Sequence, residues 1–204
     1  EKMQCHTAEH ILCGIIYATF GFDNVGFHLG DDVVTFDIDH PLTREELDRV
    51  EDLANEAVFR NLKVETFFPT KKELENETYR SKLDLTENVR LVKIGDVDSC
   101  ACCGTHVQAT GEIGLIKLFS MVKFRSGVRI EMLCGKRAFD FLSRSHEQNR
   151  QVSQTFSAKI LETGTAARKF NEQLVQEKYR ATGLQKRIFA AIADAYSGKE
   201  QVLH

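Results

Sequence analysis

The spacing of apolar residues predicts two helices in the first third of the chain. Apolar residues recur three and four positions apart over residues 3–20 and again over residues 43–62, as in helices that bury one face. At the start of the second helix, Thr43 and Glu46 have the spacing of a capping box, in which each side chain binds the other residue's backbone N–H. We therefore expect two helices, each with one buried face.

Strands are predicted where apolar and polar residues alternate or where β-branched residues gather. Five segments fit this description: residues 33–38, 63–68, 90–94, 113–124 and 128–133. Residues 125–127 (Arg-Ser-Gly) join the last two strands as a hairpin, and Thr70 with Glu73 marks a short capped helix. Because strands are mixed with helices and partly paired in hairpins, the pattern predicts an α+β fold.

The last third of the chain has the pattern of helices alone. It is helical from Lys136 onward, with a break near residues 162–164 and a second helix over about residues 166–196. The apolar residues of this second helix follow steps of about three and four: Phe170, Leu174, Ala181, Leu184, Ile188, Ala191 and Ala195. We expect this arm to pack on the core, to pair with a second copy in a homodimer, or to lead into a further domain. The predicted organisation is a core over residues 1–135 and a helical extension over residues 136–204.

Composition and charge limit the classes of protein. With 204 residues and 14 phenylalanines, the chain is long enough for one domain plus an extension. It has no apolar run of the roughly 18 residues that span a membrane and no secretory signal, so we expect a cytoplasmic protein. The net charge is −3, but residues 164–193 hold six basic and two acidic side chains. That helix either contacts RNA phosphates or presents a solvated face.

Two pairs of metal-ligand residues share one spacing. His6 and His10 lie four apart, so both project from one face of the predicted helix, and Cys102 and His106 repeat that spacing around Gly104. Neutral imidazole and thiolate are the ligands that zinc prefers, and four of them fill a tetrahedral shell. We expect Gly104 to let the backbone turn tightly enough for its two neighbours to converge. Together the two pairs predict a metal site.

The neighbouring cysteines leave alternatives open for that site. Cys100 and Cys103 are close enough to compete with Cys102, and Cys103 with His106 offers a second acceptable spacing. Three cysteines beside a histidine suit metal ligation in a reducing cytosol better than a disulfide framework. Redox chemistry by these cysteines is a further reading, but it leaves the histidines unexplained.

These motifs resemble those of a known family. His6–Leu12 (HTAEHIL) looks like the HxxxH helix of alanyl-tRNA synthetase editing domains and of AlaX-type alanyl-tRNA editing proteins. Residues 102–107 (CCGTHV) are similar to the family's Cys-Gly-Gly-Thr-His-Val, and residues 110–114 and 129–131 also match. Threonyl-tRNA synthetase editing domains share the fold and the HxxxH and are the nearest alternative. The resemblance implies a two-layer α+β editing fold with a long C-terminal helical arm. Because relatives often carry further domains, we expect the chain to be a piece of a longer protein.

The resemblance also implies a metal, a reaction and a partner. The ligands, which are also the catalytic residues, are His6, His10, Cys102 and His106, and they hold one Zn²⁺ per chain. Cys103 takes the place of a glycine, which requires a backbone angle that glycine adopts freely or a turn of changed shape. The implied activity is hydrolysis of tRNA specific for alanine that is mischarged with serine or glycine. An alanine-activating site rejects both imperfectly, since glycine is smaller and serine adds only a hydroxyl.

Four further residues are predicted to bind the substrate. Thr7 and Thr105 neighbour the ligands, and each hydroxyl either binds the serine side chain or forms local backbone bonds. His28 lies in a segment that resembles the family's substrate-facing loop, so we expect contact with the terminal adenosine or the aminoacyl group. Arg129 either reaches an RNA phosphate or pairs with a carboxylate such as Glu131.

The role of the metal has two interpretations. Four protein ligands close a zinc shell, whereas catalytic sites usually keep one position open. We therefore expect zinc mainly to position the substrate, and the alternative is a non-catalytic module for tRNA binding or dimerisation. Glu9 precedes His10 directly and points about 100° away from it on a helix, so we expect Glu9 on the surface and not as a general base.

Overall fold

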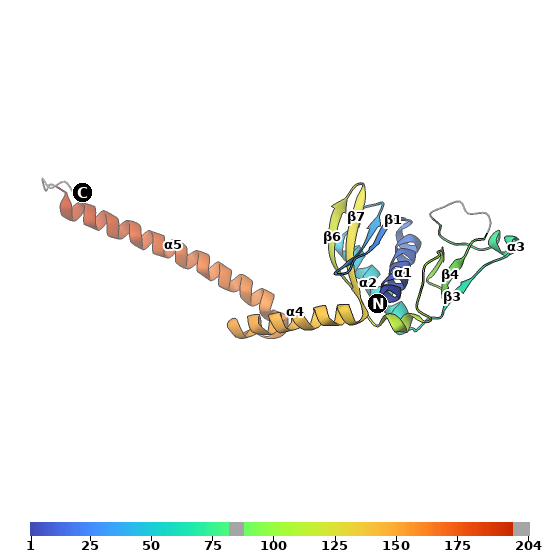
Figure 1. Cartoon of the computed structure of the whole chain (residues 1–204). Helices are drawn as coiled ribbons and strands as arrows, with labels where there is room; N and C mark the ends of the chain where they lie inside the picture. Colours follow the sequence, from blue (N-terminus) through green and yellow to red (C-terminus); the bar gives the residue numbers. More distant parts are fainter. Residues whose placement is uncertain (82–87, 198–204) are drawn as a thin grey trace. The chain divides into compact units, whose positions relative to one another are not determined.

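The computed structural model describes residues 1–81 and 88–197, so residues 198–204 of the predicted extension lie outside the described residues. The chain divides into two compact units, Glu1–Leu142 and Ser143–His204 (Figure 1). The first unit contains all the described strands, and the second contains only helices. The predicted boundary after residue 135 lies shortly before this division.

The first unit mixes helices with antiparallel strands, which confirms the predicted α+β class. Its elements in chain order are α1 (Lys2–Phe20), β1 (Asn24–Leu29), β2 (Val34–Ile38), α2 (Arg44–Phe59), β3 (Val64–Phe67), α3 (Lys71–Leu74), β4 (Leu91–Ile94), β5 (Asp98–Ala101), the 3₁₀ helix η1 (Thr110–Ile113), β6 (Ile116–Phe124), β7 (Gly127–Cys134) and the first part of α4 (Gly135–Thr155).

Two sheets flank the first helix. One has the strand order β1-β2-β7-β6 and the other β3-β4-β5, and all neighbouring strands are antiparallel. Helix α1 contacts β1 and β7 of the first sheet and β5 of the second, and α2 packs on α1 and β6 (Figure 1). Because protein surrounds α1 on several sides, more than one of its faces is buried.

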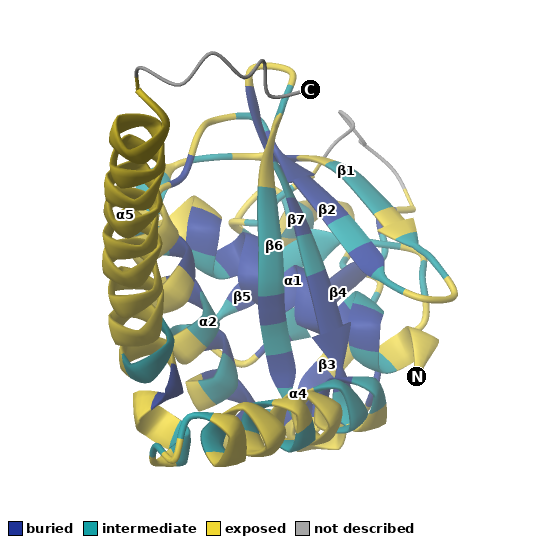
Figure 2. Ribbon diagram, turned by 90° about the vertical axis from the view of Figure 1, so that its left-hand side faces the viewer, coloured by how far each residue is buried: buried dark blue, intermediate teal, exposed yellow. Residues whose placement is uncertain are grey.

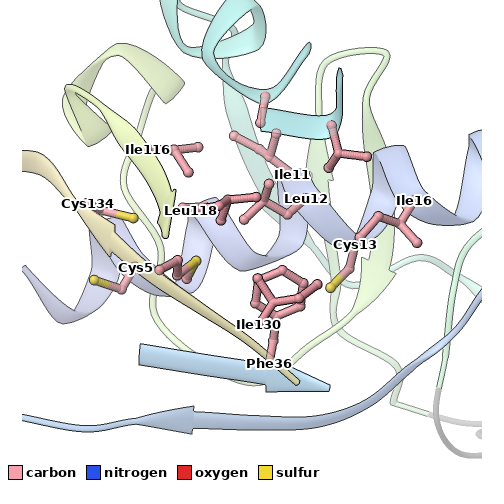
Figure 3. Packing of buried hydrophobic residues seen from close by; sticks show 14 of the residues in the cluster. Cys5, Ile11, Leu12, Cys13, Ile16, Phe36, Ile116, Leu118, Ile130 and Cys134 are labelled. Atoms are coloured by element: carbon pink, nitrogen blue, oxygen red, sulfur yellow. The ribbon is translucent and has the colours of Figure 1, made fainter. Parts of the chain in front are cut away.

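The hydrophobic core forms where α1 meets the four-stranded sheet. Ile11, Leu12 and Ile16 of α1 are fully buried and cluster with Phe36 of β2 and Ile130 of β7 (Figure 3). Figure 2 shows the middle strands of this sheet buried along much of their length. Since burying one such side chain contributes about 1.5–3 kcal/mol, this packing holds α1 firmly in place.

Both predicted capping boxes form. The Thr43 hydroxyl accepts the Glu46 N–H at 3.2 Å, and the Glu46 carboxylate accepts the Thr43 N–H at 2.7 Å. The equivalent pair at Thr70 and Glu73 opens α3. These local bonds satisfy N–H groups at each helix start that have no partner within the helix, which explains why short sequence motifs located both helices correctly.

Several predicted boundaries were wrong. Strands β1 and β5 were not predicted, and Ile113 belongs to η1 because Gly114, at φ 81°, ends that turn before β6 begins. The helical break also lies earlier than predicted. Helix α4 ends at Thr155, Ser157 has φ 50°, and α5 already begins at Thr163.

The second unit consists of the rest of α4, the short 3₁₀ helix η2 (Ile160–Glu162) and α5 (Thr163–Tyr196), which confirms the predicted long C-terminal helix. Almost every residue of α5 is exposed (Figure 2). Among the described residues, no helix combines the length and the apolar composition that crossing a membrane requires.

Candidate metal centre

Four potential ligands converge at one end of α1. His6 and His10 project from one face of this helix, with ring centroids 5.1 Å apart. Cys102 and His106 follow β5, which packs beside α1. One ligand atom from each of the four residues lies within 4.8 Å of all the others. The structure therefore brings together the set that the resemblance implies.

Hydrogen bonds orient the two histidines of α1. Nδ1 of His6 lies 3.2 Å from the Thr105 carbonyl oxygen, and Nδ1 of His10 lies 3.2 Å from Oδ2 of Asp98. A carbonyl and a carboxylate only accept, so each Nδ1 carries the hydrogen. Each ring is thereby held with Nε2 as the nitrogen left for a metal, as is usual for histidine ligands.

A buried hydroxyl orients the third histidine. The Thr7 hydroxyl donates its one hydrogen to the Met3 carbonyl oxygen at 2.9 Å and accepts the Val107 N–H at 3.2 Å. It lies 3.1 Å from Nδ1 of His106, and with its hydrogen already used it can only accept there. The Thr7 hydroxyl is thus fully bonded and 0% exposed, so in this arrangement it has no bond left for a substrate.

The donor set fits a zinc ion. Nε2 of His106 is buried and has no hydrogen-bond partner among the described residues, which is rare for a polar atom inside a protein. Sγ of Cys102 lies 3.5 Å from Nε2 of His6 and accepts the Gly104 N–H at 3.3 Å. Three imidazole nitrogens and one thiolate are a typical tetrahedral zinc shell. A cation among them would satisfy the unpaired nitrogen.

The electrostatics of the centre favour a thiolate. Burial alone would raise the pKa of Cys102, but the three imidazole rings around its sulfur and the Gly104 N–H stabilise the thiolate and lower the pKa to about 3. Burial would lower the pKa of His10, whereas Asp98, the nearby Cys102 sulfur and the charge of Glu9 raise it to about 9. The thiolate is the form of cysteine that binds metals.

Gly104 permits a close approach between the turn and helix α1. Its φ is not in the left-handed region, but a Cβ atom built on it would lie 2.2 Å from Cε1 of His6. Arg90, which sequence reasoning missed, also holds this turn: its guanidinium donates to the carbonyl oxygens of Cys102 and Gly104 at 2.7 and 2.9 Å.

The competing cysteines lie outside the four-residue cluster. Cys103 is exposed, and its φ is not in the left-handed region, so replacing the family's glycine needs no unusual backbone angle. Cys100 forms a second possible group with His10 and Asp98, but burial raises the pKa of its thiol to about 12. Two hydrogen bonds from Arg80, at 2.8 and 3.0 Å, also engage both oxygens of Asp98.

A cavity of about 510 Å³ opens beside the cluster, and its lining includes His6, His10, Cys102, Phe27, Arg80 and Glu9. The expectation that Glu9 lies on the surface was wrong, because its side chain is 7% exposed. The side chain of Glu9 points about 100° away from that of His10, but this direction does not reach solvent because a sheet lies on either side of the helix.

The ring of Phe27 stacks on His6 with centroids 5.6 Å apart.

Three other predicted residues lie away from this cavity in the described part of the chain. His28 is an exposed residue of β1, one position after Phe27 and hence on the opposite face of the strand. Thr105 has an exposed side chain. Arg129 forms two hydrogen bonds of 2.7 and 2.9 Å with Asp37, its partner across the β2–β7 register, and not with Glu131.

Fold and centre together define the class of protein: an α+β domain with a three-histidine, one-cysteine cluster beside a cavity. The sequence profile of the threonyl and alanyl tRNA synthetase second additional domain matches residues 89–131, which include Cys102 and His106. The chain is 31% identical to an alanine–tRNA ligase of Natronomonas pharaonis over 98% of its own length and 22% of the relative's. It is 32% identical to the alanyl-tRNA editing protein AlaX-L of Pyrococcus horikoshii over 67% of its own length and 35% of the relative's.

The chain belongs to the family of alanyl-tRNA synthetase editing domains and AlaX-type editing proteins. It spans about a fifth of the synthetase and about a third of the free-standing editing protein.

Proposed function

We propose that this chain hydrolyses the ester bond of mischarged tRNA specific for alanine, releasing serine and also glycine. The observation that carries the proposal is the position of the four-residue cluster: three of its members, His6, His10 and Cys102, line a cavity, in a chain of the alanyl-tRNA editing family. A cavity of about 510 Å³ is within the usual size range of small-ligand sites. It is therefore large enough for the aminoacyl end of a tRNA.

The protein's own residues fix the geometry of such a site. His6, His10, Cys102 and His106 would hold one Zn²⁺, while Thr7, Asp98 and the Thr105 carbonyl orient the rings. Bound there, zinc supplies either polarisation of the ester carbonyl or a fixed point that orients the substrate. Phe27, whose ring stacks on His6, lines the same cavity. We favour the positioning role, because four protein ligands fill a tetrahedral shell.

This reaction is needed because binding alone does not discriminate well enough between similar amino acids. A pocket that activates alanine discriminates poorly against a smaller side chain or one with an added hydroxyl. A second site that hydrolyses the wrong ester supplies the missing specificity. The partner is then mischarged tRNA in the cytoplasm.

The test is hydrolysis of Ser-tRNA, Gly-tRNA and Ala-tRNA, all on tRNA specific for alanine, by zinc-quantified protein. We expect release of serine and retention of alanine. Preferential hydrolysis of Ser-tRNA on threonine-specific tRNA would instead indicate threonyl-type editing. Zinc-free protein with full turnover would refute the role of the metal.

The closed shell also supports a second function, a structural zinc module for tRNA binding or dimerisation. Stoichiometric zinc without hydrolysis of any aminoacyl-tRNA, combined with measurable tRNA binding, would favour it over the enzyme.

A further inference from the structure

Glu9 is a buried carboxylate in the cavity wall whose hydrogen-bond partners among the described residues are neutral. Its side chain is 7% exposed. Its Oε1 accepts hydrogen bonds from the Asn24 amide and, at 3.4 Å, from the Cys13 thiol. Arg80 lines the same cavity, but its guanidinium is bound to both oxygens of Asp98. No described lysine or arginine forms an ion pair with Glu9.

Burying an ionised carboxylate is unfavourable in free energy unless a group of opposite charge compensates it. Moving an ionised group out of water is unfavourable, and neutral hydrogen bonds offset only part of that cost. Both bonds from described residues go to Oε1, which leaves Oε2 for a group that enters the cavity. A cationic ligand group would gain a charge-assisted hydrogen bond in a partly dry site.

The substrate class of the proposed function supplies one such cation. An aminoacyl ester carries an ammonium group on the carbon next to the ester carbonyl. Glu9 and His10 are successive residues of α1, and both line the cavity. A substrate whose carbonyl lies at the metal centre therefore places its ammonium group in the same part of the cavity as Glu9.

We propose that the Glu9 carboxylate binds the α-ammonium group of the esterified amino acid and so selects aminoacyl esters over uncharged acyl esters. This inference rests on the proposed function for its substrate class. It makes Glu9 a specificity-determining residue that is separate from the metal ligands. Asn24 and Cys13 then act as positioning residues, because their bonds to Oε1 fix the carboxylate.

Binding tests the proposal directly. The probes are the amide-linked 3′-seryl analogue of adenosine, which cannot be hydrolysed as an ester, and its counterpart with a neutral hydroxyl in place of the ammonium. We expect the zinc-loaded full chain to bind the ammonium probe roughly 10- to 100-fold more tightly, the range of a charge-assisted hydrogen bond. Glu9→Gln keeps the shape and the acceptor for Asn24 but removes the charge, so this preference should fall to about twofold or less. Affinity for the hydroxyl probe should stay within about threefold.

The control is Asp23→Asn, which neutralises an exposed carboxylate that also lines the cavity. It should leave the preference in place, and both variants should hold the wild-type amount of zinc. An unchanged preference in Glu9→Gln, or equal weakening of both probes, would overturn the proposal. Hydrolysis of Ser-tRNA is measured separately. If the preference depends on Glu9 but no hydrolysis occurs, Glu9 binds the ammonium group and the proposed enzymatic function is wrong. If hydrolysis occurs but the preference does not depend on Glu9, the enzymatic function stands and the proposed role of Glu9 is wrong.

Discussion

At the scale of single residues, the structure separates two adjacent cysteines. Cys102 belongs to the ligand cluster, whereas Cys103 is exposed and lies outside it. We predict that Cys102→Ala lowers bound zinc from one ion per chain to a small fraction of that value, because the shell loses its only thiolate. Cys103→Ala should keep full occupancy. Elemental analysis measures the zinc content of the purified variants. The opposite pattern would assign Cys103, not Cys102, as the ligand.

Thr7 is the residue on which the orientation of His106 depends. Thr7→Val keeps the volume but removes the acceptor for Nδ1 of His106 and for the Val107 N–H. We predict a loss of zinc affinity of roughly 10- to 100-fold and of about 1–3 kcal/mol in the free energy of unfolding. Competition with a chromophoric chelator measures the affinity. The matched control is Thr105→Val, whose exposed hydroxyl can be removed without touching the backbone carbonyl that binds His6; equal losses in both variants would contradict this role.

Residue types predicted which four residues cluster, but long-range packing decided their surroundings. His6 and His10 are recognisable because one helix sets their spacing. Asp98, which binds His10 from 88 residues away, has no such local pattern. The burial of Glu9 likewise depends on two sheets that meet α1. Arg129 pairs with Asp37 because of strand register, which the sequence of one strand does not contain.

At the scale of elements, α1 and the turn after β5 must approach very closely. We predict that Gly104→Ala lowers zinc affinity by at least tenfold, because its Cβ would lie 2.2 Å from Cε1 of His6 and even small displacements of ligands are costly. Gly183→Ala is the control. Gly183 lies in α5 with open space around it, so the change should leave zinc binding intact and stabilise the helix by about 1 kcal/mol. Zinc titration and thermal unfolding measure the two effects. A wild-type zinc affinity in Gly104→Ala would show that the turn can shift to make room for the added Cβ atom.

Elements were predictable where their signals are local. Capping boxes located the starts of α2 and α3 because the bonds join residues three apart. Strand β5 (Asp98–Ala101) gave no signal, since its sequence Asp-Ser-Cys-Ala lacks the alternating apolar pattern and its Asp98 binds His10 of the cluster. Local rules are expected to fail at functional sites for this reason.

At the scale of the whole molecule, the metal centre connects α1 to the segment after β5. We predict that removing zinc with a chelator lowers the midpoint of thermal unfolding of the Glu1–Leu142 unit, because a ligand that binds only the folded state stabilises it. Helix α5 holds none of the four ligands, so its helical signal should be unaffected. Circular dichroism in the near and far ultraviolet separates the two, and adding zinc back should restore the midpoint. An identical midpoint with and without zinc would argue against a role of the centre in stability.

The C-terminal helix α5 carries exposed apolar residues that can pack against the same helix of a second copy of the chain. Leu184 and Ile188 of α5 are 48% and 57% exposed, and one helix with such a stripe gains by pairing with another. We predict that the chain is a dimer in solution and that Leu184→Glu with Ile188→Glu makes it a monomer, since four like charges would then face each other across the interface. The control places the same two charges at exposed polar positions of α5, Gln173→Glu with Gln176→Glu, and should remain dimeric. Sedimentation equilibrium gives the mass of each. A monomeric wild type would assign the stripe to packing within the chain or to a further domain, and a dimeric Leu184/Ile188 variant would place the interface elsewhere.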